Sequence, residues 1–277
     1  MRRMKKSMGN PIVLTCANHK GGSGKSSLAG SLISALAEQG FRVLGVDGDM
    51  QRNLSTTYGL REFGKEKNLY RAIEDLDEKD DFNGADYIVS TEYENVDFIV
   101  SHEDMALLET SLMLKMAERE RYVSKLIDSI NETQDYDFIV FDTNPTLGVL
   151  NFNIFVASNH IIIPVECSAY GVDGLGAILK FYKNTRRVNK DLKIGGIVMH
   201  KVDIRKSIAK DAIEVVRDMF GDIIFNTMIS IDTSVEKSQW DEIPLLYHTP
   251  DSRAAKQYRQ LTKEVLAVVG KQSVVQK

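Results

Sequence analysis

Cysteine is scarce in this 277-residue sequence, and the two that occur, Cys16 and Cys167, are too few for a disulfide framework. Both lie in apolar contexts typical of small buried side chains. No apolar run reaches the ~18 residues that a membrane-spanning helix needs. The basic start at residues 1–6 is not followed by the apolar core of a signal peptide. With 43% hydrophobic residues, the sequence indicates a soluble, cytoplasmic protein with a sizeable core.

A large net charge is also absent, since 35 Lys and Arg oppose 39 Asp and Glu, for a net charge of −4. The distribution is uneven. Residues 176–277 hold 18 basic and 12 acidic side chains, a net of +6, so the rest of the chain holds 17 and 27, a net of −10. The last third of the chain therefore carries either a basic surface, as nucleic-acid-binding proteins do, or ordinary solvated helix faces.

Linkers, internal repeats and low-complexity stretches are missing as well. We therefore expect one domain over residues 11–270, between a basic N-terminal tail at 1–10 and a C-terminal tail at 271–277. Apolar segments typical of strands lie at 11–17, 41–46, 98–100, 138–141, 160–165, 194–200 and 223–229. Helical periodicity lies at 26–39, 118–130, 172–188, 207–219 and 252–269, with short helices and loops expected over 60–94.

The predicted strands are apolar throughout and do not alternate strictly with polar residues, as is typical of strands covered on both faces. The sequence therefore predicts a single-domain α/β fold whose mostly parallel sheet has helices on both faces. Sheets of this kind bind ligands at the carboxyl ends of their strands. The chemical motifs fall at those positions.

A glycine-rich loop follows the first predicted strand. It consists of Lys20, Gly21, Gly22, Ser23, Gly24, Lys25, Ser26 and Ser27. Its glycines let backbone amides approach phosphate oxygens, and the following helix directs its positive end at the same point. Lys25 supplies charge to the outer phosphates, and the Ser26 hydroxyl offers a ligand to Mg²⁺. The strand–loop–helix context predicts a nucleotide-binding P-loop.

Carboxylates follow two other predicted strands. Asp47 and Asp49 come directly after the strand at 41–46, and Asp142 follows four apolar residues, as in a Walker B strand. Carboxylates at such positions hold Mg²⁺ through water or orient the attacking water. We expect Asp142 to be the carboxylate on the Mg²⁺ side of the site.

The loop resembles that of the ParA/MinD group of P-loop ATPases, the deviant Walker A type, which reads K-G-G-x-G-K-[ST]. In that group the first lysine, here Lys20, reaches across a dimer to the phosphates bound by the partner subunit. Residues 47–53 resemble the D-x-D-P-Q-x-N segment, which implies that Asp49 positions the hydrolytic water and Asp47 supports the metal shell. Residues 142–148 resemble D-x-P-P-S-L-G. Met50 and Asn144 stand where prolines are usual.

Residues 101–109, 162–175 and 250–258 are similar to ParA proteins rather than to MinD. The end of the chain, at 270–277, is too short for a MinD-like membrane helix, and the start leaves little room for a helix-turn-helix domain. The resemblance implies ATP and Mg²⁺ as cofactors, a homodimer with ATP sandwiched, and nonspecific DNA binding. It also implies slow hydrolysis stimulated by a ParB-like centromere-binding protein, in plasmid or chromosome partition at the nucleoid.

Further candidate positions concern DNA and the nucleotide base. The DNA candidates are Arg205, Lys206, Lys210, Arg253 and Lys256. Ser234 stands where many relatives carry a DNA-contacting arginine, so the DNA site transfers less completely than the ATP site. Asp232 and Pro250 are candidates for the base pocket. Residues 200–203 resemble the N-K-x-D element by which related GTPases read guanine, which keeps GTP as an alternative.

Three other functions compete with partition. The first is a MinD-like positioning ATPase or another nucleotide-switched regulator of the same group. The second is a metabolic or redox enzyme on the same scaffold, such as an amide-forming synthase or a nitrogenase-reductase relative. A reductase needs cysteines for an iron–sulfur cluster, and Cys167 lacks a companion cysteine. The third is a non-hydrolytic filament former, against which the intact Asp49 and Asp142 count.

Overall fold

A seven-stranded sheet forms the centre of the computed structural model, which describes residues 9–115, 117–168, 174–203, 205, 207–272 and 274, with only the backbone at 207–210. The strand order is β3-β4-β2-β5-β1-β6-β7, with every neighbouring pair parallel except β3 and β4. The strands are β1 Ile12–Cys16, β2 Val43–Gly48, β3 Val89–Ser90, β4 Val96–Ile99, β5 Phe138–Thr143, β6 His160–Glu166 and β7 Lys193–His200.

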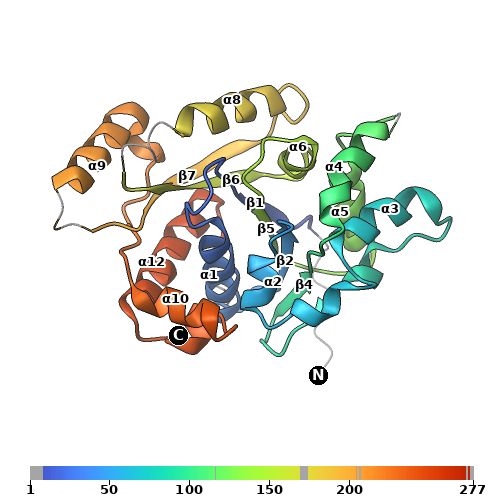
Figure 1. Ribbon diagram of the computed structural model, residues 1–277, viewed down its shortest axis with the longest axis horizontal. Helices are drawn as coiled ribbons and strands as arrows, with labels where there is room; N and C mark the ends of the chain where they lie inside the picture. Colours follow the sequence, from blue (N-terminus) through green and yellow to red (C-terminus); the bar gives the residue numbers. More distant parts are fainter. Residues whose placement is uncertain are drawn as a thin grey trace.

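Helices cover both faces of this sheet (Figure 1). One layer contains α1 Lys25–Glu38, α2 Asn53–Thr57, α10 Thr233–Trp240, α11 Leu245–His248 and α12 Arg253–Val268. The other contains α3 Leu69–Glu78, α4 Met105–Leu114, α5 Tyr122–Thr133, α6 Val149–Ala157, α8 Leu175–Thr185 and α9 Ser207–Phe220. Short 3₁₀ turns lie at η1 Arg61–Gly64, η2 Gly84–Tyr87 and η3 Gly221–Ile223. Among the described residues, no helix is both long and apolar enough to cross a membrane.

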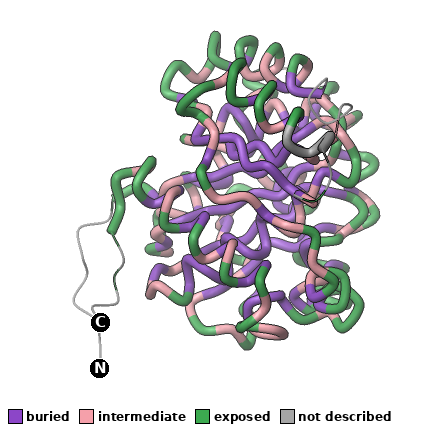
Figure 2. The backbone as a smooth tube through the Cα atoms, turned by 90° about the vertical axis from the view of Figure 1, so that its left-hand side faces the viewer, coloured by how far each residue is buried: buried purple, intermediate pink, exposed green. Residues whose placement is uncertain are grey.

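The two layers exist because strand side chains alternate between the faces of a sheet. On β6, Ile161 and Ile163 pack with α8, whereas Ile162 packs in the cluster that contains α1 and α12. Every residue of β2 and β5 is buried. Figure 2 shows the buried residues of the chain gathered in the interior of the molecule. The prediction of a mostly parallel sheet with helices on both faces is confirmed.

The strand predicted at 223–229 is wrong. This segment begins in η3 and makes only isolated bridges, Ile224 with Ile197 and Ser230 with Val202. The physical reason is a side chain from α12: the Glu264 carboxylate accepts hydrogen bonds from the backbone N–H groups of residues 226 and 227, at 2.7 and 3.0 Å. A side chain therefore supplies acceptors where a continuous strand would use main-chain carbonyls.

The other predicted elements differ mainly at their ends. The helix predicted at 118–130 begins four residues later, at Tyr122, and extends to Thr133. The helix predicted at 172–188 is described from Leu175 to Thr185, and residues 169–173 lie outside the described part of the chain. The region at 60–94 contains short helices and loops as expected, and in addition the edge strand β3.

Candidate nucleotide site

Three neighbouring strands bring the predicted chemical groups to one edge of the sheet. In the register of β1, β5 and β2, Asp142 pairs with Cys16 on one side and with Asp47 on the other. The glycine-rich loop leaves the end of β1 at this level and leads into α1. A cleft of about 640 Å³ opens here, and its lining includes Gly21, Gly22, Gly24, Lys25, Ser26, Ser27 and Asp49.

The loop requires glycine at two points. Gly22 and Gly24 have φ angles of 73° and 93°, in the left-handed region that side chains other than glycine rarely adopt. At Gly24 a Cβ atom would also lie 2.4 Å from the ring of His200. No side chain of the described residues caps the N-terminus of α1. Its first amides are therefore available to an anion, as in phosphate-binding loops.

Lys25 lies at the start of α1 and is buried. Its ammonium donates a hydrogen bond to the carbonyl of Lys20 at 3.2 Å. Burial lowers the pKa of Lys25, and the charges of Asp142 and Asp49 oppose that shift. The side chain therefore places a positive charge between the loop and the acids.

Asp142 is buried, and neither of its carboxylate oxygens has a hydrogen-bond partner among the described residues. Burial raises the pKa of Asp142 well above its usual value, and the charge of Asp47 adds to the shift. The nearby Ser26 hydroxyl and the charge of Lys25 act in the opposite direction. An ionised carboxylate buried without partners is costly, and a cation would offset that cost. Among the described residues, no group of three or more His, Cys, Asp or Glu side chains is arranged to hold a metal ion by itself. This fits Mg²⁺, which is commonly held by one or two carboxylates together with water and phosphate.

Asp47 and Asp49 differ in their surroundings. The carboxylate of Asp47 accepts hydrogen bonds from the Asp49 N–H at 3.1 Å and from the N–H and hydroxyl of Ser55 at 2.8 and 2.7 Å. Burial raises the pKa of Asp47 to about 6 against the effect of these bonds. Asp49 lines the cleft, and its Oδ1 accepts from the N–H of Gln51 at 3.0 Å. Asp47 therefore holds the turn that carries Asp49 into the cleft.

Lys20 does not line the cleft in this single chain. Its ammonium forms an ion pair with Glu166 at the end of β6, with 3.0 Å between Nζ and Oε2. The N–H of Lys20 donates to the side chain of Asn18, which in turn donates to the carbonyl of Pro164. Both partners of the ion pair are about one-third exposed, at 30% and 33%. The loop lysine is thus directed toward β6.

The segment after Asp142 compensates for its missing proline. The Asn144 side chain accepts hydrogen bonds from the N–H and hydroxyl of Thr146, which closes the turn. At the far end of the segment, Glu109 of α4 accepts from the first two amides of α6, at 2.7 and 3.2 Å. A Cβ at Gly148 would lie 2.4 Å from this carboxylate, so a larger residue there would displace the Glu109 side chain from the start of α6.

Two residues at the phosphate loop, Glu166 and Lys201, were not predicted to lie there. The ammonium of Lys201, just after β7, donates to the carbonyl of Gly22 at 2.8 Å. Both residues follow the rule that ligand sites form at the carboxyl ends of parallel strands, here β6 and β7. That rule was the one signal in the sequence that could have pointed to them.

Of the two residues proposed for the base pocket, Asp232 lies at the cleft and Pro250 does not. Asp232 lines the cleft, and its carboxylate also accepts hydrogen bonds from the N–H groups of Ser234 and Ala254, at 3.0 and 3.1 Å. Pro250 is not part of the cleft lining. The carboxylate of Asp203, which would read a guanine, is engaged in an ion pair with Arg205 and also lies outside the lining.

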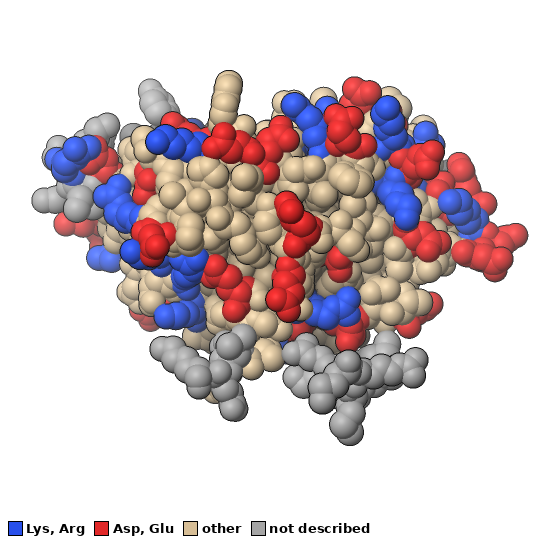
Figure 3. Space-filling view, turned by 90° about the horizontal axis from the view of Figure 1, so that it is seen from below, with Lys and Arg blue, Asp and Glu red and all other residues tan. Residues whose placement is uncertain are grey.

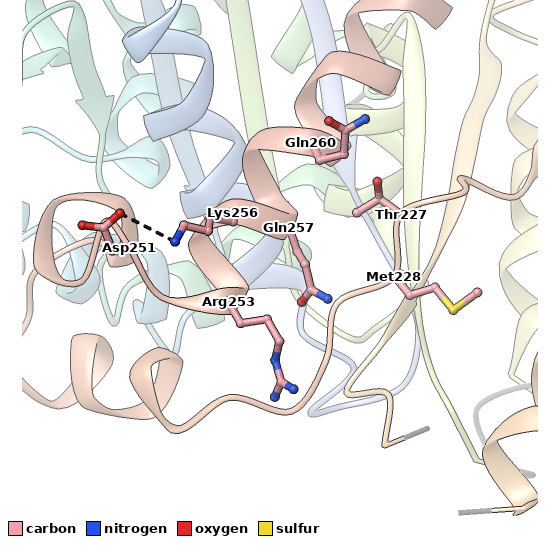
Figure 4. Close-up of a pocket in the computed structure, with 7 residues that line it drawn as sticks. All are labelled: Thr227, Met228, Asp251, Arg253, Lys256, Gln257 and Gln260. Atoms are coloured by element: carbon pink, nitrogen blue, oxygen red, sulfur yellow. Dashed lines mark ion pairs between the residues drawn. The ribbon is translucent and has the colours of Figure 1, made fainter. Parts of the chain in front are cut away.

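Two of the DNA candidates, Arg253 and Lys256, line a second pocket of about 540 Å³ between α12 and residues 227–228 (Figure 4). Arg253 donates to the carbonyl of Ile231 at 2.6 Å, and Lys256 lies 3.7 Å from Asp251. Figure 4 shows the Lys256 side chain directed toward Asp251. Both cations are accessible at the surface of the first turn of α12.

The remaining DNA candidates are Arg205, Lys206 and Lys210. Arg205 pairs with Asp203, with 2.8 Å between Nε and Oδ1. Lys206 and the side chain of Lys210 lie outside the described residues. On the face seen in Figure 3, basic and acidic side chains are interspersed and form no continuous basic surface.

Comparisons with known proteins agree with this geometry. A protein family described as an AAA domain matches residues 12–194. The chain is 32% identical over 261 residues to the sporulation initiation inhibitor protein Soj of Bacillus subtilis. The aligned residues cover 94% of this chain and 99% of Soj. It is 29% identical over 260 residues to the chromosome partitioning protein ParA of Caulobacter vibrioides, covering 93% and 95%. Cobyrinic acid a,c-diamide synthase from Mycobacterium smegmatis, solved with ADP and magnesium, matches with a TM-score of 0.79 and 25% identity over 94% and 96% of the two chains.

Proposed function

The chain belongs to the ParA family of partition ATPases, and from this premise we propose that it hydrolyses ATP with Mg²⁺ as a nucleotide-switched dimer in DNA partition. One observation supports this most directly: Lys25, Asp49 and the unpartnered Asp142 meet the phosphate loop at adjacent strand ends. The relatives named for chromosome partition match nearly the whole chain.

Each residue has a separate task in this proposal. The loop amides and Lys25 bind the phosphates, while the Ser26 hydroxyl and Asp142 lie on the metal side. Mg²⁺, when bound with ATP, would neutralise charge on the phosphates. The Asp49 carboxylate accepts a hydrogen bond from the attacking water and orients it toward the terminal phosphate, and Asp47 holds the turn beneath Asp49.

Replacing Asp142 by asparagine should separate stability from activity. Asp142→Asn removes a buried, unpartnered charge, so we expect the nucleotide-free protein to melt ~2–4 °C higher, which corresponds to ~1 kcal/mol, while ATP turnover is lost. Calorimetry without Mg²⁺ and a phosphate-release assay measure the two effects. Asp47→Asn is the matched control and should lower the melting temperature, because Asp47 accepts three hydrogen bonds. A lower melting temperature in both variants would contradict this account.

Dimerisation requires Lys20 to leave Glu166 if it is to reach the nucleotide of a partner subunit. Glu166→Gln weakens the ion pair, which at this exposure contributes at most ~1 kcal/mol. We therefore expect an ATP-dependent dimerisation constant about two- to fivefold more favourable, measured by sedimentation. The matched control is Glu38→Gln, since the pair of Glu38 with Arg259 is similarly exposed, at 31% and 30%. Equal constants for both variants would show that Glu166 does not restrain Lys20.

Binding to DNA and to a ParB-like partner completes the proposal and implies association with the nucleoid. A dimer would double the cationic surface contributed by Arg253 and Lys256, so ATP would favour the DNA-bound form. The test is DNA binding with ATP, with ADP and without nucleotide, over a series of salt concentrations. Binding that requires ATP and falls linearly in log affinity against log salt supports the proposal. Binding independent of nucleotide contradicts it.

A metabolic synthase is the second candidate, because the M. smegmatis synthase shares the fold at 25% identity. The two functions differ in what stimulates turnover. A partition ATPase responds to DNA and its partner protein, whereas a synthase requires an organic acid and a nitrogen donor. The higher identity to Soj favours partition.

A further inference from the structure

Among the described residues that line the cleft, Lys201 is the one Lys or Arg that the proposed mechanism has not used. It follows β7 directly and lines the cleft together with Gly22 and Gly24. Its Nζ donates to the carbonyl oxygen of Gly22 at 2.8 Å, across 179 residues of sequence. The contact joins the end of β7 to the phosphate loop.

The backbone of Lys201 is held in an uncommon conformation. Its φ angle is 54°, in the left-handed region that residues other than glycine seldom adopt. Main-chain hydrogen bonds fix both neighbours: the His200 carbonyl accepts from the N–H of Cys167 at 3.1 Å, and the N–H of Val202 donates to Ile229 at 2.9 Å. Such a conformation persists where the surrounding structure determines it, and it is concentrated at functional sites.

His200, the last residue of β7, also holds this strand end against the phosphate loop. The buried ring of His200 lies against Gly24, and its Nε2 is 2.7 Å from the hydroxyl of Tyr258. Burial lowers the pKa of His200 to about 3, so the ring is neutral at ordinary pH. Position 201 is therefore rigidly placed relative to the loop.

The bond to Gly22 has a consequence for the next amide. In a trans peptide the C=O and the following N–H point in opposite directions. Fixing the carbonyl of Gly22 therefore fixes the direction of the Ser23 N–H, one of the amides expected to bind phosphate. Gly22 needs this restraint because glycine moves readily between backbone conformations. An ammonium group also has three donors, and Gly22 uses one.

We propose that Lys201 is a nucleotide-positioning residue: it holds the Gly22–Ser23 peptide in its phosphate-binding orientation and adds positive charge to the cleft. The inference rests on the proposed nucleotide site. The ligand class is nucleoside di- and triphosphates, because the restraint acts on the loop and not on the terminal phosphate alone. Lys201 thus differs from Lys20, whose proposed role is to reach the nucleotide bound by a partner subunit.

The test compares Mg-ATP and Mg-ADP binding in the full chain by titration calorimetry. Lys201→Met should bind both nucleotides about tenfold more weakly, with kcat at saturating ATP changed less than about threefold. Lys201→Arg should recover most of the affinity, since it also carries a cationic donor. Lys193→Met, at the opposite end of β7, is the matched control and should leave both affinities unchanged.

A second variant separates the charge from the backbone. Lys201→Gly suits a φ of 54° and removes the ammonium, so it should fold and bind as weakly as Lys201→Met. Normal affinity in either of these variants would overturn the inference. Lys25→Ala is measured in parallel. If that variant binds nucleotide normally, the proposed nucleotide site itself is wrong. If it does not, normal affinity in the Lys201 variants rejects only the role of Lys201.

Discussion

Lys25→Ala should weaken ATP binding by at least about 100-fold, the largest effect on affinity that we expect from one substitution. The buried ammonium of Lys25 lies where the loop would hold phosphates, and a charge-assisted contact in such surroundings is worth ~3 kcal/mol. Removing it also leaves Asp142 without one of the two groups that oppose its pKa shift. A titration with Mg-ATP measures the loss.

Lys20→Ala is the matched control for this prediction. Its ammonium pairs with Glu166 outside the cleft, so one chain should bind ATP within about threefold of normal after its removal. Equal ATP affinities for Lys25→Ala and the unmodified chain would contradict the assignment of residues 20–27 as a phosphate-binding loop.

Asp49→Ala should keep ATP binding and lose at least about 100-fold in turnover, the largest effect that we expect on rate. Its carboxylate lines the cleft and accepts only a local backbone N–H from Gln51 among the contacts described, so it is placed to orient water. A positioned base contributes ~10²–10⁴ to a rate. Single-turnover measurements with DNA and partner protein present are the proper readout, because unstimulated hydrolysis is expected to be slow.

Asp49→Asn distinguishes charge from shape. It preserves the size of the side chain but cannot act as a base, so its rate should fall nearly as far as that of Asp49→Ala. Turnover retained in both variants would exclude Asp49 from the mechanism, even if ATP binding proceeds as proposed.

The parallel sheet could be predicted because its strands carry a local signal. Buried strands such as β2 and β5 are apolar along their whole length, and the loop at 20–27 identifies the end of β1. Helix α6 gave no such signal, because its residues are apolar around most of its circumference and show no helical period. The strand predicted at 223–229 was wrong because two of its amides, those of residues 226 and 227, donate to Glu264, a residue of α12 that no local pattern connects to them.

The site shows the same difference between features with a local sequence signal and contacts between distant residues. The phosphate loop and the three acids could be predicted as candidates because each occupies a short motif beside a strand. The contacts of Lys20 with Glu166 and of Lys201 with Gly22 join residues 146 and 179 positions apart. Spacing in the sequence cannot reveal such pairs, since only the strand order brings them together.

Strand order also gives the site a direction. β1 has the acid-bearing strands β5 and β2 on one side, and β6 and β7, which lead to Glu166 and Lys201, on the other. A ligand seated on the central loop would therefore have Asp49 and Asp142 on one flank and Lys201 on the opposite flank. An elongated ligand with a metal at one end would be admitted in a single orientation, and the sequence of strands in the sheet selects it.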